Sequence, residues 1–318
     1  MNDETLYARL EQLCADGNIE RSRLVGVEST LLQTLDRFGI PYRETDAILE
    51  LESKLTLINL DSIQKKIGKA AGLNSFDWQY RLVTESTNAD ALQLFETNQA
   101  PCVTLAEMQT SGRGRRGRQW LSPFAKNICC TIGMLKSLEA CNPGLLSIVT
   151  GIALVQSLAK LGIEGVRLKW PNDLVYQNQK LGGILIESRS TGQRDYFFAI
   201  GFGINVTMNA EELAAIPQSA TSLSLMTDGA VSRNAVLVEV IQQVVNAIDA
   251  FDRSSIPRMI ENFHALDALR GQSISVQSGH ESIDGLNLGI NADGQLQLET
   301  GQGRQVFSAA DISLGKSA

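Results

Sequence analysis

Residues 112–118 concentrate positive charge and glycine within a chain that is acidic overall. Four arginines and three glycines fill this segment, no acidic residue interrupts it, and Trp120 follows two positions later. Glycine lets backbone N–H groups converge on one anion, arginine offers a planar fork for carboxylate or phosphate, and an indole can stack on a base. The segment predicts an anion-binding loop, although a solvated basic loop or a nucleic-acid contact would have a similar composition.

A second group of charged residues surrounds a predicted turn. The apolar run VRLKW ends at Trp170, and Pro171 and Asn172 directly after it favour a turn. That turn leaves Lys169 and Asp173 at the edge of a sheet. Lys180 follows shortly afterwards, before two glycines that would let a ligand approach the next strand closely. Taken alone, the pattern is equally typical of a hairpin with exposed lysines.

Two polar clusters lie at the ends of predicted strands. Ser86, Thr87 and Asn88 follow the run YRLVTE and precede a helical pattern, so capping the helix is their simplest role. Asn205 ends the run AIGFGIN, whose glycines lack the strand-to-helix context of a dinucleotide-binding fold. Neither cluster identifies a ligand by itself.

In this order, the motifs STN, EMQTSGRGRRGRQW, KWPNDL, KLGGILIE and IGFGIN resemble those of the biotin protein ligase family. The resemblance covers about residues 80–315, and it is greatest to the bacterial BirA type. That type joins an N-terminal winged-helix module to a catalytic domain like those of class II aminoacyl-tRNA synthetases and lipoate ligases, followed by a C-terminal SH3-like β-barrel. The resemblance thus implies an ATP-dependent biotin–[biotin carboxyl carrier protein] ligase.

The implied chemistry explains the cationic residues. Biotin would be activated with ATP to biotinyl-5′-AMP and then transferred to a lysine of the biotin carboxyl carrier protein of acetyl-CoA carboxylase. Two anions must meet in the first step, so lysine, arginine and Mg²⁺ would neutralise their repulsion. Water would destroy the mixed-anhydride intermediate, so a loop that closes over it would protect it. No histidine suits the role of general base in the transfer step, and the base stays open.

The resemblance also assigns roles residue by residue. Biotin would be held by hydroxyl, amide, glycine and cationic positions: Ser86, Thr87, Asn88, Gln109, Gly112, Arg113, Gly114, Arg115 and Lys180. ATP would contact Arg116, Arg118, Trp120, Lys169, Asn172, Asp173, Lys180 and Asn205. The catalytic cations would be Lys180, Arg115 and Arg113. No residue is a certain metal ligand, since Mg²⁺ would arrive with ATP, and Asp173 with Asn172 would contact the metal or the nucleotide.

Three regions would position these residues in an α+β (mixed α/β) protein. Residues 1–70 show two helical patterns, a hairpin formed by the runs AILEL and LTLINL, and a short helix capped by Asp61, which together outline a winged-helix module. Residues 74–269 alternate strands and helices, as the catalytic domain requires. Residues 270–318 carry short β-runs between Gly, Asn and Asp turns, which predict the small barrel.

The N-terminal module is predicted to be degenerate for DNA binding. Residues 17–29 leave little room for the helix that positions a recognition helix, so that helix is shortened or lost. Residues 1–70 also carry nine basic and twelve acidic residues, a net charge of −3 that DNA-binding modules seldom show.

Ligase activity is therefore the expected main function, and a bifunctional ligase that also represses a biotin operon is the alternative. A lipoate or octanoate ligase of the same fold, a catalytically inactive regulator and an unrelated α/β protein with a nucleic-acid tether are weaker alternatives.

Composition excludes several other classes of protein. The chain has 318 residues, 43% of them hydrophobic, and a net charge of −7, which is typical of a soluble protein of two or three domains. With only His264 and His280, a histidine-rich metal site is excluded. An acidic surface does not favour bulk binding to nucleic acid or membrane, and no apolar run approaches the roughly 18–20 residues that span a bilayer.

Cysteine usage and the N-terminus indicate the compartment. The chain shows no CxxC pair among its five cysteines, which are Cys14, Cys102, Cys129, Cys130 and Cys141. An odd and scattered set is typical of reduced thiols in the cytoplasm. The first residues are polar and acidic, unlike a signal peptide. The oligomeric state stays open, with a homodimer through edge strands of the central sheet as one option.

Overall fold

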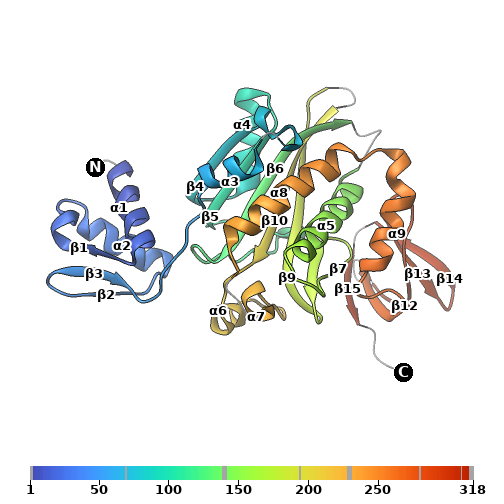
Figure 1. Cartoon of the computed structure of the whole chain (residues 1–318). Coiled ribbons are helices and arrows are strands. Elements are labelled where there is room, and N and C mark those ends of the chain that lie inside the picture. The colour runs from blue at the N-terminus through green and yellow to red at the C-terminus, as the bar shows by residue number, and fades with distance from the viewer. Residues whose placement is uncertain are drawn as a thin grey trace.

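The computed structural model describes residues 3–68, 70–137, 142–192, 195–227, 231–278, 281–308 and 310–314. Three β-sheets follow one another along the chain, with the N-terminal and C-terminal sheets on opposite sides of a larger central sheet (Figure 1). The predicted α+β class is confirmed. Cys141 and His280 lie outside the described residues.

The N-terminal module contains the two predicted helices and a small sheet. Its elements are α1 (Asp3–Asp16), β1 (Asn18–Glu20), a 3₁₀ helix (Arg21–Leu24), α2 (Glu28–Phe38), β2 (Tyr42–Glu44) and β3 (Ile48–Leu51), with strand order β1-β3-β2. Gly39 ends α2 in the left-handed conformation, with φ of 64°. Between α1 and α2 the one helical segment is the four-residue 3₁₀ helix that follows β1, as the predicted shortening requires.

Two details of this region were predicted wrongly. The run LTLINL is not a strand, because the backbone N–H groups of Ile58 and Asn59 are bound by the side chains of Glu107 and Asn234 instead of a neighbouring strand. Helix α3 (Leu60–Ile67) is capped by Asn59, whose Oδ1 accepts a hydrogen bond of 2.8 Å from the Ser62 amide. Asp61 instead lies in the first turn, where its negative charge interacts favourably with the positive end of the helix dipole.

The central sheet has seven strands in the order β4-β5-β6-β10-β9-β8-β7. Only the β4–β5 pair is parallel. A 3₁₀ helix at Ala70–Ser75 precedes this sheet. The strands are β4 (Asp77–Thr84), β5 (Cys102–Gln109), β6 (Asn127–Ser137), β7 (Arg167–Lys169), β8 (Asp173–Tyr176), β9 (Gln179–Ser190) and β10 (Asp195–Asn205).

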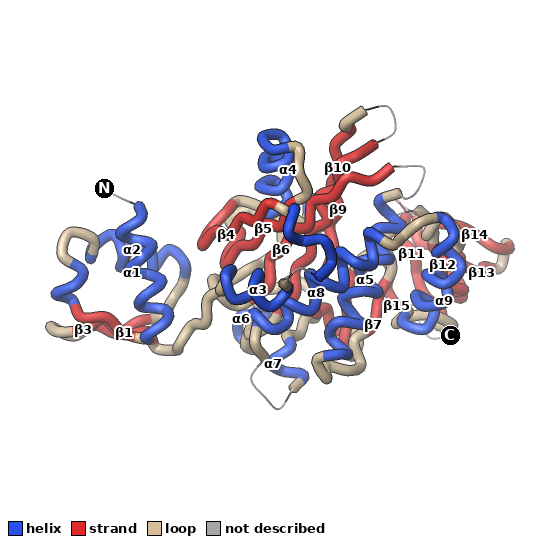
Figure 2. Tube along the Cα trace, turned by 45° about the horizontal axis from the view of Figure 1, so that its top comes forward, coloured by secondary structure: helices blue, strands red, loops and turns tan. Residues whose placement is uncertain are grey.

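Helices cover both faces of this sheet. Along β10, Phe197 and Phe198 point to opposite faces, as the two-residue period of a strand requires. Phe197 stacks on Phe95 of α4 (Thr87–Asn98), with ring centroids 4.0 Å apart. Phe198 joins the core under α5 (Pro143–Lys160) and α8 (Arg233–Asp249), which lie side by side on the other face (Figures 1 and 2).

Helix α5 corrects the expectation that no apolar run reaches membrane-spanning length. Its 18 residues have a mean hydropathy of 1.3 and are long and apolar enough to cross a bilayer. However, 67% of them are buried inside the protein, and the helix packs against α8 and β9. We therefore assign α5 to the core of the central region.

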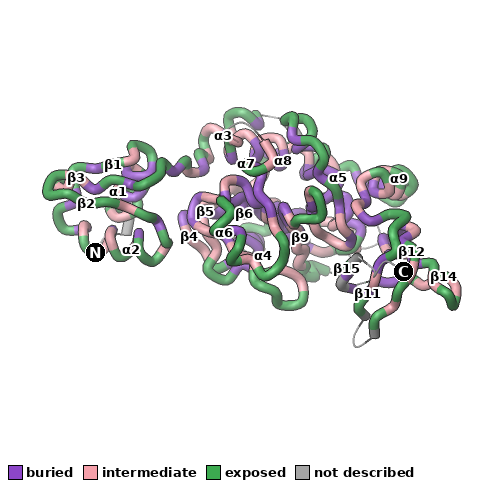
Figure 3. The backbone as a smooth tube through the Cα atoms, turned by 90° about the horizontal axis from the view of Figure 1, so that it is seen from below, coloured by how far each residue is buried: buried purple, intermediate pink, exposed green. Residues whose placement is uncertain are grey.

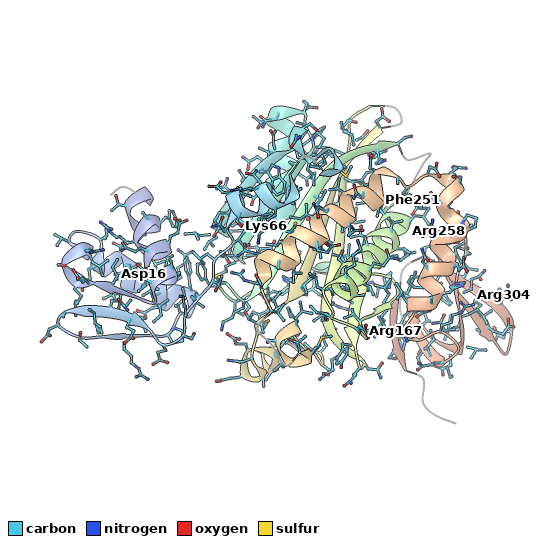
Figure 4. The ribbon with its side chains drawn as sticks, viewed as in Figure 1. Asp16, Lys66, Arg167, Phe251, Arg258 and Arg304 are labelled. Atoms are coloured by element: carbon cyan, nitrogen blue, oxygen red, sulfur yellow. The ribbon has the colours of Figure 1, made fainter. Side chains whose placement is uncertain are left out.

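The C-terminal sheet packs against the central region through one continuous core. Helix α9 (Ile256–Leu266), which the sequence patterns did not reveal, leads into it. Arg167 of β7 donates from Nη1 to the Ala265 carbonyl at 2.9 Å, close to the junction of the two sheets (Figure 4). The Trp170 indole donates to the Gly294 carbonyl, also at 2.9 Å.

Five antiparallel strands form this sheet in the order β14-β13-β12-β11-β15, consistent with the predicted SH3-like barrel. They are β11 (Ser273–Ser278), β12 (Glu281–Ile290), β13 (Leu296–Thr300), β14 (Gly303–Phe307) and β15 (Asp311–Leu314). The remaining short helices are a 3₁₀ turn at Arg115–Gly117, α6 (Ala210–Ala214), α7 (Leu223–Met226) and a 3₁₀ turn at Arg253–Ser255.

The segment that joins the N-terminal module to the central region is fixed at buried positions (Figure 3). Arg233, at the start of α8, lies 2.7 Å from Glu107 Oε2, and both side chains are almost fully buried. The guanidinium also donates to the Thr56 carbonyl. Phe38 of α2 stacks on Phe124 of the central region, with centroids 5.3 Å apart. The module is thus held by an aromatic contact, and the segment that follows it is held by hydrogen bonds to a buried ion pair of the central region.

We expect acid to weaken the contact between α9 and the C-terminal sheet. Burial, followed by the charge of Arg270, lowers the pKa of His264 below its ordinary 6.5. Its Nε2 accepts a 3.0 Å hydrogen bond from the Ile290 amide, which a proton on Nε2 would abolish. A folded-state pKa below the unfolded value gives stability that is complete above pH 6.5 and decreases as pH falls toward the lower pKa.

Thermal unfolding of the wild type and of His264→Gln across this pH range checks the expectation. The melting temperature of the wild type should fall more steeply on acidification than that of the variant. Parallel curves for the two proteins would contradict the assignment to His264.

Candidate functional site

One cavity of about 690 Å³ collects residues from every predicted motif. It opens on the face of the central sheet that α4 covers, beside the carboxyl end of β10. Every predicted site residue except Gly112 lines it: Ser86, Thr87, Asn88, Gln109, Arg113, Gly114, Arg115, Arg116, Arg118, Trp120, Lys169, Asn172, Asp173, Lys180 and Asn205.

Glycines of β10 make the floor of this cavity. Gly203 is aligned with Cys129 of β6 and Gly183 of β9, and a Cβ on Gly203 would lie 2.5 Å from the Trp120 ring. On Gly201, a Cβ would lie 2.1 Å from Asn88 Oδ1. The glycines of the motif IGFGIN are therefore required because an indole and an amide lie directly on the strand.

The basic loop is a closed hairpin above this floor. The Trp120 amide donates to the Gly112 carbonyl at 2.8 Å, and the Gly114 amide donates to the Arg118 carbonyl at 2.7 Å. Arg116, with φ of 58°, turns the chain at the tip. Gly112 itself lies at the base of the loop, where a Cβ would be 2.8 Å from the Trp120 carbonyl. Its contribution is therefore close backbone packing, and it does not line the cavity.

The STN cluster lies at the start of α4, but its first member does not cap the helix. Ser86 occupies the N-cap position without a capping hydrogen bond from its side chain, although it is only 7% exposed. The Thr87 amide and hydroxyl both donate to Gln109 Oε1, at 2.9 and 3.2 Å. The simple capping interpretation of Ser86 is thus wrong, and the residue lines the cavity instead.

Lys180 and Asp173 form an ion pair at the cavity wall. Lys180 Nζ lies 2.8 Å from Asp173 Oδ1, and both side chains are about one-fifth exposed. They come from the neighbouring strands β9 and β8, and both contact the position where Gly183 carries no side chain. Lys169 lies on the edge strand β7, as predicted, and its backbone is aligned with that of Asp173 in the antiparallel pairing of β7 with β8.

Asn205 ends β10 at the far side of the cavity. Its Nδ2 donates to the Thr221 carbonyl at 3.0 Å. Its Oδ1 is buried and has no hydrogen-bond partner among the described residues. Because a buried acceptor without a partner is costly, this atom is suited to a donor supplied by a ligand.

Several cavity residues gave no sequence signal. Ala310 and Ile312 come from the C-terminal sheet, and residues 215–218 come from the turn after α6. Cys129, which is aligned with Gly203 on the neighbouring strand, does not line the cavity, and burial raises the pKa of its thiol to about 11. Such residues approach the cavity only through tertiary folding.

The cavity offers a magnesium ion one carboxylate at most. Among the described residues no three His, Cys, Asp or Glu side chains gather to hold a metal. Asp173 is already paired with Lys180. Mg²⁺ is usually bound by one or two carboxylates together with substrate phosphates, so the residues present fit an ion that arrives with a nucleotide.

One cavity is lined by the basic loop, by Lys180, by the hydrogen-bonded Thr87 and Gln109, and by the Trp120 indole. This combination defines an enzyme that joins a small carboxylic acid to a nucleotide. Comparison with protein families agrees. The model of the biotin/lipoate A/B protein ligase family matches residues 80–205. The model of the biotin protein ligase C-terminal domain matches residues 270–315.

Individual relatives are similar over most of their length. The bifunctional ligase/repressor BirA of Escherichia coli K12 is 30% identical over 99% of this chain and 98% of that protein. The biotin–[acetyl-CoA-carboxylase] ligase of Paracoccus denitrificans is 32% identical over 73% of this chain and 98% of that protein. The solved structure of the Aquifex aeolicus biotin protein ligase in complex with biotin and ATP gives a TM-score of 0.63 at 26% identity, covering 76% of this chain and 99% of that chain. The chain belongs to the biotin/lipoate A/B protein ligase family, among its biotin protein ligases.

Proposed function

We propose that this chain activates biotin with ATP to biotinyl-5′-AMP and transfers the biotinyl group to a lysine of the biotin carboxyl carrier protein of acetyl-CoA carboxylase. The observation that carries the proposal is the meeting of the basic loop, Lys180 and the Thr87–Gln109 pair around one cavity. Cations and neutral hydrogen-bonding groups are thus placed side by side, as an acid with a polar ring requires.

The polar end of the cavity suits the ureido ring of biotin. Ser86 has a hydroxyl that does not cap the helix, and Gln109 has an amide NH₂ besides the oxygen that Thr87 uses. These groups can satisfy a neutral ring whose unpaired polar atoms would each cost about 1–3 kcal/mol. A plain acyl chain, as in octanoate, would leave the same groups unsatisfied, so biotin is favoured over lipoate or octanoate.

In the first step, a carboxylate oxygen of biotin attacks the α-phosphorus of ATP and pyrophosphate leaves. Lys180 lies where it can contact both the carboxylate and the α-phosphate, while Arg113 and Arg115 approach from the loop. Their charges oppose the repulsion between the anions and stabilise the charge that develops in the transition state. Binding both substrates in one cavity supplies the orientation.

The nucleotide would occupy the other end of the cavity. Trp120 lies against Gly203 and lines the cavity, where its ring could pack near the base, and Asn205 Oδ1 lacks a partner that an adenine amino group could supply. Arg116, Arg118, Lys169 and Asn172 complete the surrounding wall. Mg²⁺, carried by the phosphates and within reach of Asp173, would neutralise pyrophosphate charge.

In the second step, the amine of the acceptor lysine attacks the acyl carbon of the adenylate and AMP leaves. The amine must first lose its proton, either to a nearby carboxylate or through its own small neutral fraction. The hairpin of residues 112–120 lies over the cavity and would keep water from the anhydride until the acceptor arrives.

Pyrophosphate exchange tests the choice of substrate. The protein should exchange labelled pyrophosphate into ATP when biotin is added, and much more slowly with lipoate or octanoate at equal concentration. Exchange that prefers an acid without the ureido ring would overturn the assignment.

We infer that the N-terminal module does not read DNA. The positioning helix is reduced to one 3₁₀ turn, and Arg21 in that turn is paired with Glu28 at the start of α2 and with Glu44 of β2. An arginine held by two carboxylates cannot easily neutralise phosphates, on which DNA affinity largely depends. The net charge of −3 over residues 1–70 acts in the same direction.

Fluorescence anisotropy with the chain's own biotin-operon promoter, in the presence of biotin and Mg-ATP, tests this inference. We expect no binding tighter than to unrelated DNA of equal length. Sequence-specific binding that weakens steeply with salt would show a bifunctional ligase and repressor instead.

We also propose three functional units, residues 1–70, 74–269 and 270–318, in a cytoplasmic protein. The four cysteines within the described residues are buried and unpaired, which supports a reducing compartment. The central sheet ends in β4 and β7, but residues 267 and 268 already bond to Leu168 of β7, so a homodimer through the sheet would use β4.

A further inference from the structure

A chain of polar contacts links the basic loop to the biotin end of the cavity. Glu187 of β9 lies at its centre: Arg113 Nη2 donates to both carboxylate oxygens, at 3.1 and 3.3 Å. Asn88 Nδ2 donates to Oε2 of the same carboxylate at 2.8 Å. The carboxylate thus joins the loop to the first turn of α4.

The contacts continue from Asn88 to the groups that would hold biotin. The Thr131 hydroxyl lies 2.7 Å from Asn88 Oδ1 and 2.8 Å from Thr87 Oγ1. Thr87 in turn donates to Gln109. Both ends of the Asn88 amide are therefore bound within the protein, and this cavity-lining residue, predicted to bind biotin, is also placed to orient its neighbours.

The pairing of β9 with β10 leaves room on the sheet for Asn88 and Glu187 to meet. Glu187 is aligned with Ala199 of β10, and the neighbouring row places Leu185 beside Gly201. Asn88 lies over Gly201, where any larger residue would displace its amide. Asn88 is 4% exposed and Glu187 is about one-quarter exposed, so the carboxylate is shielded on the side of Asn88 and open on the side of the loop.

We infer that Glu187 is a positioning residue that tethers the basic loop over the occupied cavity. This inference rests on the proposed function, since the loop is taken to retain the adenylate. The carboxylate holds Arg113 toward β9 while Asn88 fixes the carboxylate, so closure of the loop and the geometry of the biotin end are coupled. The tether is electrostatic, because it pairs a half-exposed guanidinium with a carboxylate.

Glu187→Gln separates the two contacts. Glutamine Oε1 can still accept from Asn88, whereas its NH₂ group would meet Arg113 with a donor. The biotin end should therefore keep its geometry while the loop loses its tether. Glu96→Gln is the matched control, because Glu96 pairs with Arg189 between the same two elements, α4 and β9, away from the cavity.

Two measurements on the full chain test the inference. In the protein without substrates, hydrogen exchange at the amides of Gly114 and Trp120 should be about two- to fivefold faster in Glu187→Gln than in wild type or Glu96→Gln. In the protein loaded with biotin and Mg-ATP, release of the adenylate to solution should rise by a similar factor, while the KM for biotin changes less. At about 1 M salt the difference between variant and wild type should vanish.

Equal exchange and equal release in Glu187→Gln and wild type would overturn the tether. A higher KM for biotin with unchanged release would also overturn it, because Glu187 would then only support Asn88. The exchange measurement needs no substrate, so it decides the tether separately from the proposed function. If no adenylate forms in the wild type, the proposed function fails.

Discussion

Lys180→Ala should reduce biotin-dependent adenylate formation by about 10²–10³-fold, the usual cost of removing one preorganised group that stabilises transition-state charge. Lys180 is the cation that its strand holds at the cavity wall, and Asp173 beside it fixes the ammonium within 2.8 Å. Without the lysine, Asp173 would add a negative charge where two anions must meet. The rate should therefore fall through both a missing cation and an unpaired carboxylate.

Single-turnover formation of adenylate from biotin and labelled ATP measures this effect. Lys160→Ala is the matched control, because Lys160 is also ion-paired, with Glu239 at 3.1 Å, but lies on α5 away from the cavity. The control should react like the wild type. Adenylate formation by Lys180→Ala at more than a tenth of the wild-type rate would contradict the role given to Lys180.

Arg233→Ala should lower the free energy of unfolding by about 3–5 kcal/mol, the cost of breaking a buried ion pair by removing one partner. Glu107 is fully buried, and without Arg233 its Oε2 would lose its ionic partner. The variant would also lose the guanidinium contacts to the carbonyls of Thr56 and Asn127. Both the linker and the start of β6 would then be less well fixed.

Urea denaturation of the full chain measures this loss, with Arg43→Ala as control. Arg43 pairs with Glu52 on an exposed surface, where an ion pair contributes about 0–1 kcal/mol. Replacing Glu107 by Gln in the Arg233→Ala background should recover part of the lost stability, because a neutral amide is cheaper to bury than a carboxylate. A single-variant loss no larger than that of the control would show that the buried pair does not stabilise the fold.

The composition of the site was predictable because its residues occur in specific local motifs. Four arginines and three glycines in seven positions indicated an anion loop from the residues alone, whereas the grouping of Ser86, Lys169 and Lys180 depended on the resemblance. Periodicity carries no information about which strands pair, so only the family comparison brought these distant segments together. The structure confirms that they line one cavity.

The supporting residues could not be predicted, because their partners are distant in sequence. Glu187 is one charged residue at the end of an apolar run, and Thr131 is one hydroxyl within a strand. Their roles arise from the pairing of β6, β10 and β9, which places them beside Asn88. Asn88 lines the cavity as its motif predicted, but its hydrogen bonds within the protein had no sequence signal.

Sequence rules for helix ends and strands held where no tertiary contact competed with the predicted structure, and they failed where one did. Gly39 ended α2 as its conformational freedom predicts, and no other group lies within 4 Å of the place that its Cβ would take. The run LTLINL has the alternation of a strand, but Glu107, Arg233 and Asn234 bind its backbone groups individually. The apolar pattern of this run predicted which of its residues are buried. Its backbone structure depends instead on hydrogen bonds to side chains from other elements.

The central claim is that this chain attaches biotin to a carrier lysine by way of an adenylate. Incubating the full chain with biotin, Mg-ATP and a biotin carboxyl carrier domain, followed by intact-mass and peptide analysis of the carrier, tests it most directly. We expect the mass of one biotinyl group on a single carrier lysine, dependent on ATP and lost in Lys180→Ala. An unmodified carrier, or one that gains lipoyl or octanoyl groups in place of biotin, would contradict it.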